Sequence, residues 1–256
     1  MIACIIVASD NYGSDRIDPL TIIVIGVVFT AALTQATLGF GFALLAMPML
    51  TLAMPTPSAA ALVAMLAALL SAVMLAQRWR ALNFRAASGL LIGASAGTPL
   101  GLFVLSAAPR SVIAPALGIG VIAVSAYLLF QPAVGRLRGP FWKYVFGFGA
   151  GLTGGAYNIS APLLIVFSAT QRWDPDEFRV TLQAFFLPTA MFVVLGHGAA
   201  GNYSPEVARL LLFGAPALLV ATVLGRGLSA VVPAERFAPI VYSACMGLGA
   251  LLIFTG

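Results

Sequence analysis

The feature that most constrains the fold is one uncharged apolar run, residues 20–54, that is interrupted by glycines and a proline. The run has about 35 residues, whereas a single transmembrane helix needs about 20. Gly39 and Gly41 free the backbone from helical geometry, and Pro48 removes a hydrogen-bond donor. An unpaired backbone group facing lipid costs several kcal/mol, so an interrupted helix must face protein or a watery cavity. The run therefore predicts a broken helix near 39–41 that lines a substrate path.

The composition indicates a membrane protein. Hydrophobic residues make up 61% of the chain and charged residues only 8%, whereas soluble domains carry about 25% charged residues. The net charge of +5 does not indicate nucleic acid, because no basic cluster is interleaved with aromatic residues. Lys and Arg instead gather in cytoplasmic loops of membrane proteins. We expect a multi-pass protein of the cell inner or plasma membrane. Its expected partner is the lipid bilayer, and we expect no binding of nucleic acid.

Ten apolar segments predict an all-α fold of about ten full or half transmembrane helices. Some segments begin with a helix-capping residue followed by proline, as at Asp18-Pro19. The segments cover residues 20–38, 41–54, 58–77, 86–107, 111–130, 141–152, 159–170, 179–198, 206–228 and 237–255.

The two halves of the chain resemble each other. Gly101 to Phe130 aligns without gaps on Gly225 to Phe254, and the first break returns over Gly149 to Pro162. Two alignments in the same order indicate an internal duplication. This predicts a second broken helix near 153–160. The predicted divisions are an N-terminal tail over 1–19, a first transmembrane repeat over 20–130, a linker over 131–140 and a second repeat over 141–256.

The path of each broken run decides whether the repeats are parallel or inverted. A run that crosses once gives four spans per half and parallel repeats, and a re-entrant run gives five per half and inverted repeats. With five per half and the N-terminus outside, ten Lys and Arg lie at cytoplasmic ends and three outside. The best four-span orientation gives about eight against five. The positive loop 78–85 also corresponds to residues 197–204, which lack Lys and Arg. These counts favour two inverted repeats of five, an extracytoplasmic tail and a cytoplasmic linker.

The apolar segments indicate an anion path. Asp and Glu are absent from their interiors, which argues against a carboxylate proton relay or cation site. Helix N-termini carry about half a positive charge and unpaired N–H groups, so two half-helices aimed at the midplane can hold a small anion. The candidate substrate-binding residues are Thr34, Gln35, Thr37, Gly39, Phe40, Gly41, Thr153, Gly154, Gly155, Tyr157, Asn158, Ser160 and Gln183.

Several of these residues have a second interpretation. The glycines serve close helix packing equally well, and an isolated Thr commonly bonds back to a carbonyl of its own helix. Gln183 fits either a ligand contact or an interhelical bond, and His197, at a segment end, fits an interfacial residue better than a proton carrier. Cys4 and Cys245 have no partner spacing. We expect no metal and no cofactor.

The breaks are similar to those of the sulfite exporter TauE/SafE family of membrane permeases. The matching pieces are Gly39-Phe40-Gly41 with Pro48, Gly149 to Gly155 with Pro162, and Gly97 to Gly101. The resemblance covers nearly the whole chain and implies sulfur oxyanions as substrates, with sulfite, sulfonates and sulfoacetate-like compounds as typical cases. The chain departs from the family's glycine triplet at Phe40, Phe42 and residues 156–158. This leaves open an organic anion with an apolar part.

We therefore expect a secondary transporter or facilitator that exports small sulfur oxyanions. An inside-negative potential drives each negative charge outward by about 2.3 kcal/mol per 100 mV. The alternatives are a permease for another small organic anion, a proton-coupled importer, or a non-transporting assembly subunit. The sequence is also compatible with a homodimer. An intramembrane enzyme would need a nucleophile–base pair or metal ligands, for which the apolar segments offer too few residues.

Overall fold

In the computed structural model, the described residues form ten α-helices and one short 3-10 helix, which confirms the predicted all-α class. These residues are 18–107, 109–130, 137, 139–173, 175–231 and 234–255. The α-helices are α2 (Pro19–Leu38), α3 (Phe42–Ala53), α4 (Thr56–Arg78), α5 (Phe84–Ala107), α6 (Arg110–Phe130), α7 (Phe141–Tyr157), α8 (Ala161–Gln171), α9 (Pro175–Ala199), α10 (Pro205–Val231) and α11 (Ala234–Thr255). The 3-10 helix η1 covers Trp79–Ala81. Most of the predicted tail (1–17) and linker (131–136 and 138) lies outside the described residues.

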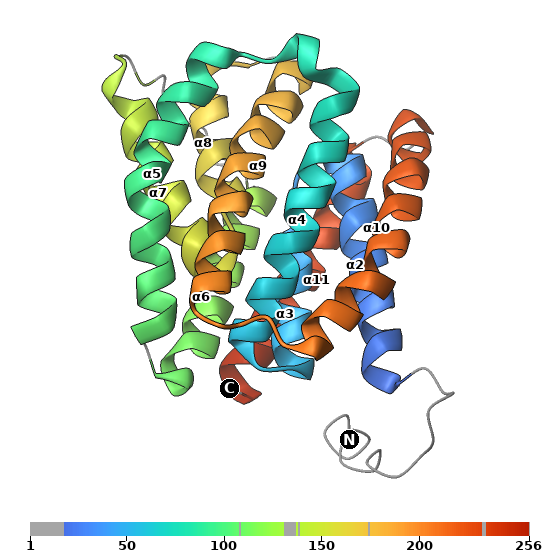
Figure 1. The fold of residues 1–256 in the computed structure, drawn as a ribbon. Helices are drawn as coiled ribbons and strands as arrows, with labels where there is room; N and C mark the ends of the chain where they lie inside the picture. Colours follow the sequence, from blue (N-terminus) through green and yellow to red (C-terminus); the bar gives the residue numbers. More distant parts are fainter. Residues whose placement is uncertain are drawn as a thin grey trace.

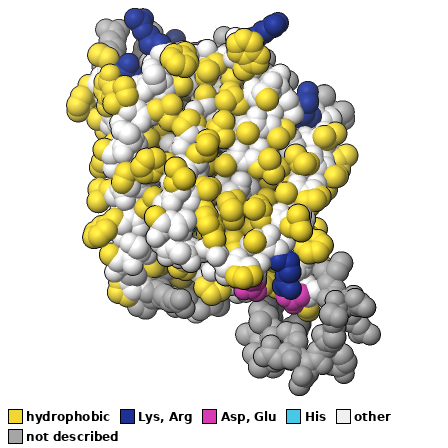
Figure 2. All heavy atoms as spheres, viewed as in Figure 1, with side chains coloured by type: hydrophobic (Ala, Val, Ile, Leu, Met, Phe, Trp, Pro, Cys, Tyr) yellow, Lys and Arg dark blue, Asp and Glu magenta, His cyan; other side chains and the backbone are white. Residues whose placement is uncertain are grey.

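In the described part of the chain, six helices are long and apolar enough to cross a bilayer, namely α2, α4, α5, α6, α9 and α10. The helices α3 and α8 are apolar but shorter. Large apolar side chains such as Phe103, Leu195 and Leu212 are exposed on the outside of the bundle. In Figure 2, hydrophobic side chains cover the visible face, most visible Lys and Arg lie toward its upper end, and a further basic side chain lies at the lower end beside acidic ones. The chain is a multi-pass membrane protein.

The helices pack in pairs that link the two halves of the chain. The most extensive pairing is α5 with α7, followed by α2 with α10, α6 with α11 and α4 with α9. Exchanging α2–α6 for α7–α11 maps this set of four pairings onto itself. The α4–α5 connection lies at the upper end of the bundle in Figure 1, whereas the corresponding α9–α10 connection lies at the lower end.

Glycines bring the backbones of α5 and α7 into contact. A Cβ at Gly97 would lie 2.1 Å from the carbonyl oxygen of Phe148, and one at Gly155 would lie 2.2 Å from that of Thr98. Small residues permit this close approach where lipid supplies no hydrophobic driving force between helices. The packing fixes α7, and with it the start of α8.

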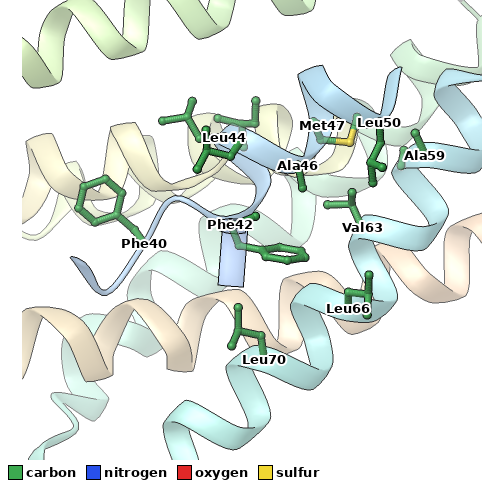
Figure 3. Packing of buried hydrophobic residues seen from close by; sticks show 14 of the residues in the cluster. Phe40, Phe42, Leu44, Ala46, Met47, Leu50, Ala59, Val63, Leu66 and Leu70 are labelled. Carbon is green, nitrogen blue, oxygen red and sulfur yellow. The ribbon is translucent and has the colours of Figure 1, made fainter. Parts of the chain in front are cut away.

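The helix α3 packs along α4 through fully buried side chains. The side chains of Phe42, Met47 and Leu50 are completely buried. Figure 3 shows this face of α3 directed toward Val63 and Leu66 of α4. Burying a side chain of this size contributes about 1.5–3 kcal/mol where it leaves water. Within the bilayer the gain comes from close packing. The contact holds the first turn of α3 in a fixed position.

Candidate functional site

The first helix interruption is made by two glycines in left-handed conformations. The helix α2 ends at Leu38, Gly39 has φ +91°, and Gly41 has φ +112° immediately before α3 begins. Side-chain-bearing residues rarely adopt these angles, whereas glycine does so without steric cost. The amide N–H of Gly39 donates to the carbonyl of Gln35 at 2.7 Å and closes α2.

Two buried glutamines hold this interruption against α9. The Gln35 side-chain oxygen accepts from the N–H of Phe42 at 3.2 Å, and its Nε2 donates to Oε1 of Gln183, also at 3.2 Å. The Nε2 of Gln183 donates to the carbonyl of Gly39 at 2.8 Å. We call these two amides with their backbone partners the amide cluster. It pairs backbone groups that would otherwise be unsatisfied at membrane depth.

The second interruption uses asparagine where the first uses glycine. The helix α7 ends at Tyr157, and Asn158 follows with φ 58°, a left-handed conformation that Asn tolerates better than most residues. Its side chain donates to the carbonyl of Ala60 on α4 at 3.1 Å. Ser160 then precedes α8 without making a side-chain capping bond.

Both interruptions open onto one small cavity, which we call the central cavity. It has a volume of about 50 Å³, and its walls come from the first turns of α3 and α8, with further residues from α4 and α9. A single water needs about 10–15 Å³ measured in this way. Among the described residues its lining includes no Asp or Glu. Its lining includes Gln35, Gly41, Phe42, Ala43, Leu44, Ser71, Gly154, Asn158, Ser160 and Thr189.

The backbone supplies the positive potential in the central cavity. Gln35 accepts from the N–H of Phe42, the first residue of α3, and Ser160 makes no side-chain capping bond to α8. The first N–H groups of a helix have no intrahelical acceptor, and a helix N-terminus carries about half a positive charge. Two such helix ends, those of α3 and α8, border this one small cavity.

Ser71 is a lining residue that the sequence did not single out. Its hydroxyl is fully buried and has no hydrogen-bond partner in the described part of the protein. Most buried polar groups are paired, so this donor is available to a solute in the cavity. The signal in the sequence was one Ser in the middle of an apolar helix. Thr189, also missed, already donates to the carbonyl of Phe185.

Several predicted residues lie near the breaks but make other contacts. The hydroxyls of Thr34, Thr37 and Thr153 donate to carbonyls of their own helices. Tyr157 and Thr153 line a separate, mainly apolar cavity beside α6. These side chains do not converge on the central cavity.

Two further predicted residues serve packing. Gly155 packs against α5, as described above. Phe40 lines the central cavity, and its ring centroid lies 6.3 Å from those of Phe178 on α9 and Tyr242 on α11. In Figure 3, the ring of Phe40 extends from the loop between the two helices and lies apart from the ring of Phe42. The central cavity brings together six of the predicted residues, namely Gln35, Phe40, Gly41, Gly154, Asn158 and Ser160.

Residues 24–252 match the protein family described as "Sulfite exporter TauE/SafE". It is 25% identical over 226 residues to a Cupriavidus necator protein named "Probable sulfite/organosulfonate exporter TauE", and this alignment covers 86% of the present chain and 88% of that protein. No solved structure matches. The family match spans most of the chain, including both helix interruptions and the walls of the central cavity, and the chain therefore belongs to the sulfite exporter TauE/SafE family.

Proposed function

We propose that this chain exports small sulfur oxyanions, such as sulfite or organosulfonates, through the central cavity. Members of its family are membrane transporters, so the chain is a transporter and not an enzyme. The name of the similar C. necator protein gives it sulfite and organosulfonate export. The observation that carries the proposal is the meeting of two helix N-termini, those of α3 and α8, at one cavity.

The anion is held by neutral donors. The N–H groups of Ala43 and Leu44 at the start of α3 face it from one side, and the start of α8 with the Ser160 hydroxyl faces it from the other. Ser71 adds a hydroxyl from α4. A hydrogen bond to a charged group contributes about 1.5–3 kcal/mol, so three or four of them replace much of the hydration of a small oxyanion. Such a site binds the anion and still releases it.

The two repeats, residues 20–130 and 141–256, are inverted, and α3 and α8 are the returning arms of re-entrant pairs. The exchange symmetry of the helix pairings supports this arrangement. The opposite positions of the α4–α5 and α9–α10 connections in Figure 1 support it as well. The cation-rich end is cytoplasmic and the tail extracytoplasmic, in agreement with the distribution of Lys and Arg. The central cavity then lies at the repeat interface, where rocking of one repeat against the other gives alternating access.

Export follows from the charge of the substrate. An inside-negative potential favours outward movement of an anion by about 2.3 kcal/mol per elementary charge per 100 mV, so no coupling ion is needed. The central cavity has no carboxylate lining it in the described part of the chain to carry a coupled proton. A potential-driven exporter is therefore favoured over a proton-coupled importer.

The test is flux of labelled sulfite and of an organosulfonate in proteoliposomes at set membrane potentials. We expect flux of at least one of these anions, with a rate that rises as the potential drives negative charge out of the substrate compartment. Flux that follows an imposed pH gradient at zero potential would instead identify the proton-coupled importer. Transport of another organic anion, with none of any sulfur oxyanion, would contradict the proposed substrate class.

A further inference from the structure

A second, larger cavity opens beside the amide cluster and carries two arginines. It has a volume of about 410 Å³ and lies between the C-terminal halves of α4 and α10 and the N-terminal half of α9. Arg179 and Arg226 line it together with Gln77 and Gln183. We call it the arginine cavity. Among the described residues no Asp or Glu lines it.

The amide cluster separates the arginine cavity from the central cavity. Gln35 lines the central cavity, Gln183 lines the arginine cavity, and their side chains are bonded to each other. Arg179 lies over the same break, because a Cβ at Gly39 would be 2.7 Å from its Cγ. Its Nη2 also donates to the carbonyl of Thr37 at 3.4 Å. This contact offsets the partial negative charge at the C-terminal end of α2, which would otherwise repel an anion.

The other end of the bundle has a corresponding cavity without arginine. This cavity has a volume of about 430 Å³ and is lined by residues that include Leu102, Phe103 and His197. The gapless alignment of Gly101–Phe130 on Gly225–Phe254 places Arg226 at the position of Leu102. The two cavities therefore occupy related places in the two repeats, and only the one at the cation-rich end has Lys or Arg in its described lining.

We propose that the arginine cavity is the entrance that gathers the anionic substrate from the cation-rich side, with the Gln35–Gln183 pair as its inner barrier. This inference rests on the proposed function. A cleft lined by charges of one sign raises the local concentration of the opposite ion, and the effect falls as salt rises. The substrate class is a small sulfur oxyanion, and the arginine-free cavity at the other end is its exit. Because the exit cavity lacks these arginines, its affinity for the anion is lower than that of the arginine cavity, which favours release.

The test compares the two faces of the membrane in wild type and in Arg226→Gln. Inside-out and right-side-out vesicles present organosulfonate to one face at a time, at low and at high salt. We expect Arg226→Gln to raise KM at the arginine face by roughly five- to tenfold at low salt, to lose most of this difference at high salt, and to leave the other face unchanged. Arg226→Lys keeps the charge and should stay within about twofold of wild type.

Arg209→Gln is the matched control. Arg209 lies near the start of α10 and Arg226 near its end. Arg209 forms an ion pair with Asp18 at 3.0 Å and lines neither cavity, so its loss should shift KM at neither face. An unchanged KM for Arg226→Gln, or an equal rise at both faces, would overturn the entrance. A rise seen only in anionic lipid and absent in phosphatidylcholine would assign the cavity to lipid headgroups and also overturn it. If the protein transports another anion but no sulfur oxyanion, and Arg226→Gln raises KM for that anion at the arginine face alone, the proposed substrate is wrong but the arginine cavity is still the entrance.

Discussion

The two helix interruptions reach the central cavity with different chemistry. At the first, Gly39 and Gly41 turn the chain, and two buried glutamine side chains pair the exposed backbone groups. At the second, Asn158 makes the turn itself with a single bond to Ala60, and Ser160 leaves its helix start uncapped. The first break is thus fixed by contacts from α9, whereas the second keeps a hydroxyl available for a solute.

Because of this difference, we expect the two repeats to have different roles in transport. A rigid backbone turn sets the direction of α3, and a polar side chain beside α8 adds a donor to the anion. Preorganised N–H groups cost no reorganisation when the anion binds, because they are already held in place. Substitutions at the first break should therefore affect transport through structure, and those at the second through affinity.

The largest effect is expected from Gly41→Val. A β-branched residue at φ +112° is strained by about 1–3 kcal/mol, and its Cβ would lie 3.2 Å from Cγ2 of Thr34. We expect transport per molecule of protein to fall at least about tenfold. Gly26→Val is the control, because a Cβ there meets nothing within 4 Å. Flux normalised to protein in proteoliposomes measures both, and equal losses would show that the turn has no special role.

A smaller loss is expected from Gln183→Leu. This change leaves the Gly39 carbonyl and the Gln35 amide without their partner, at about 1–3 kcal/mol for each buried group. We expect a lower melting temperature and a drop in transport of about fivefold. Asn158→Gly keeps the left-handed turn and removes only the bond to Ala60. If Asn158→Gly reduces transport as much as Gln183→Leu, then side-chain contacts hold both interruptions equally firmly, which would contradict the difference described above.

Ser160→Ala should act on affinity. Losing one donor to a charged ligand should raise KM for sulfite by about three- to tenfold, while the maximal rate stays within about twofold. Ser168→Ala on the same helix is the control, since that hydroxyl donates to the carbonyl of Ile165. Initial rates of flux over a range of substrate concentration give both constants. A fall in maximal rate with unchanged KM would move Ser160 from binding to structure.

The smallest effect is expected from Thr153→Val. Its hydroxyl donates to the carbonyl of Gly149 within α7 and lines a different cavity. We expect KM and maximal rate to stay within about twofold of wild type, because an intrahelical Thr bond contributes little to helix stability. A larger change in KM would show that the substrate path runs beside α6 as well.

The sequence predicted the helices better than the contacts around the breaks. Uncharged runs such as residues 20–38 can only be helical in lipid, so α2 ends where the run reaches its glycines. This prediction depends on residues close together in the chain, which is why the sequence alone could make it.

The partners of individual side chains were less accessible, because they depend on helix rotation. The sequence could not tell whether Gln183 faces a ligand or a helix, and in the structure it bonds across to Gln35 and Gly39. Gly155 and Gly154 are neighbours in sequence, yet one faces α5 and the other lines the central cavity. A rotation of about 100° per residue separates these two environments.

The most direct test of the account is a structure with selenite, a heavier analogue of sulfite, bound to the protein. Crystals soaked in selenite and measured at the selenium edge would locate the anion by its anomalous signal. We expect a peak in the central cavity, between the first N–H groups of α3 and the Ser160 hydroxyl beside α8. A selenium peak only outside this cavity, in a protein that still transports sulfite, would contradict it.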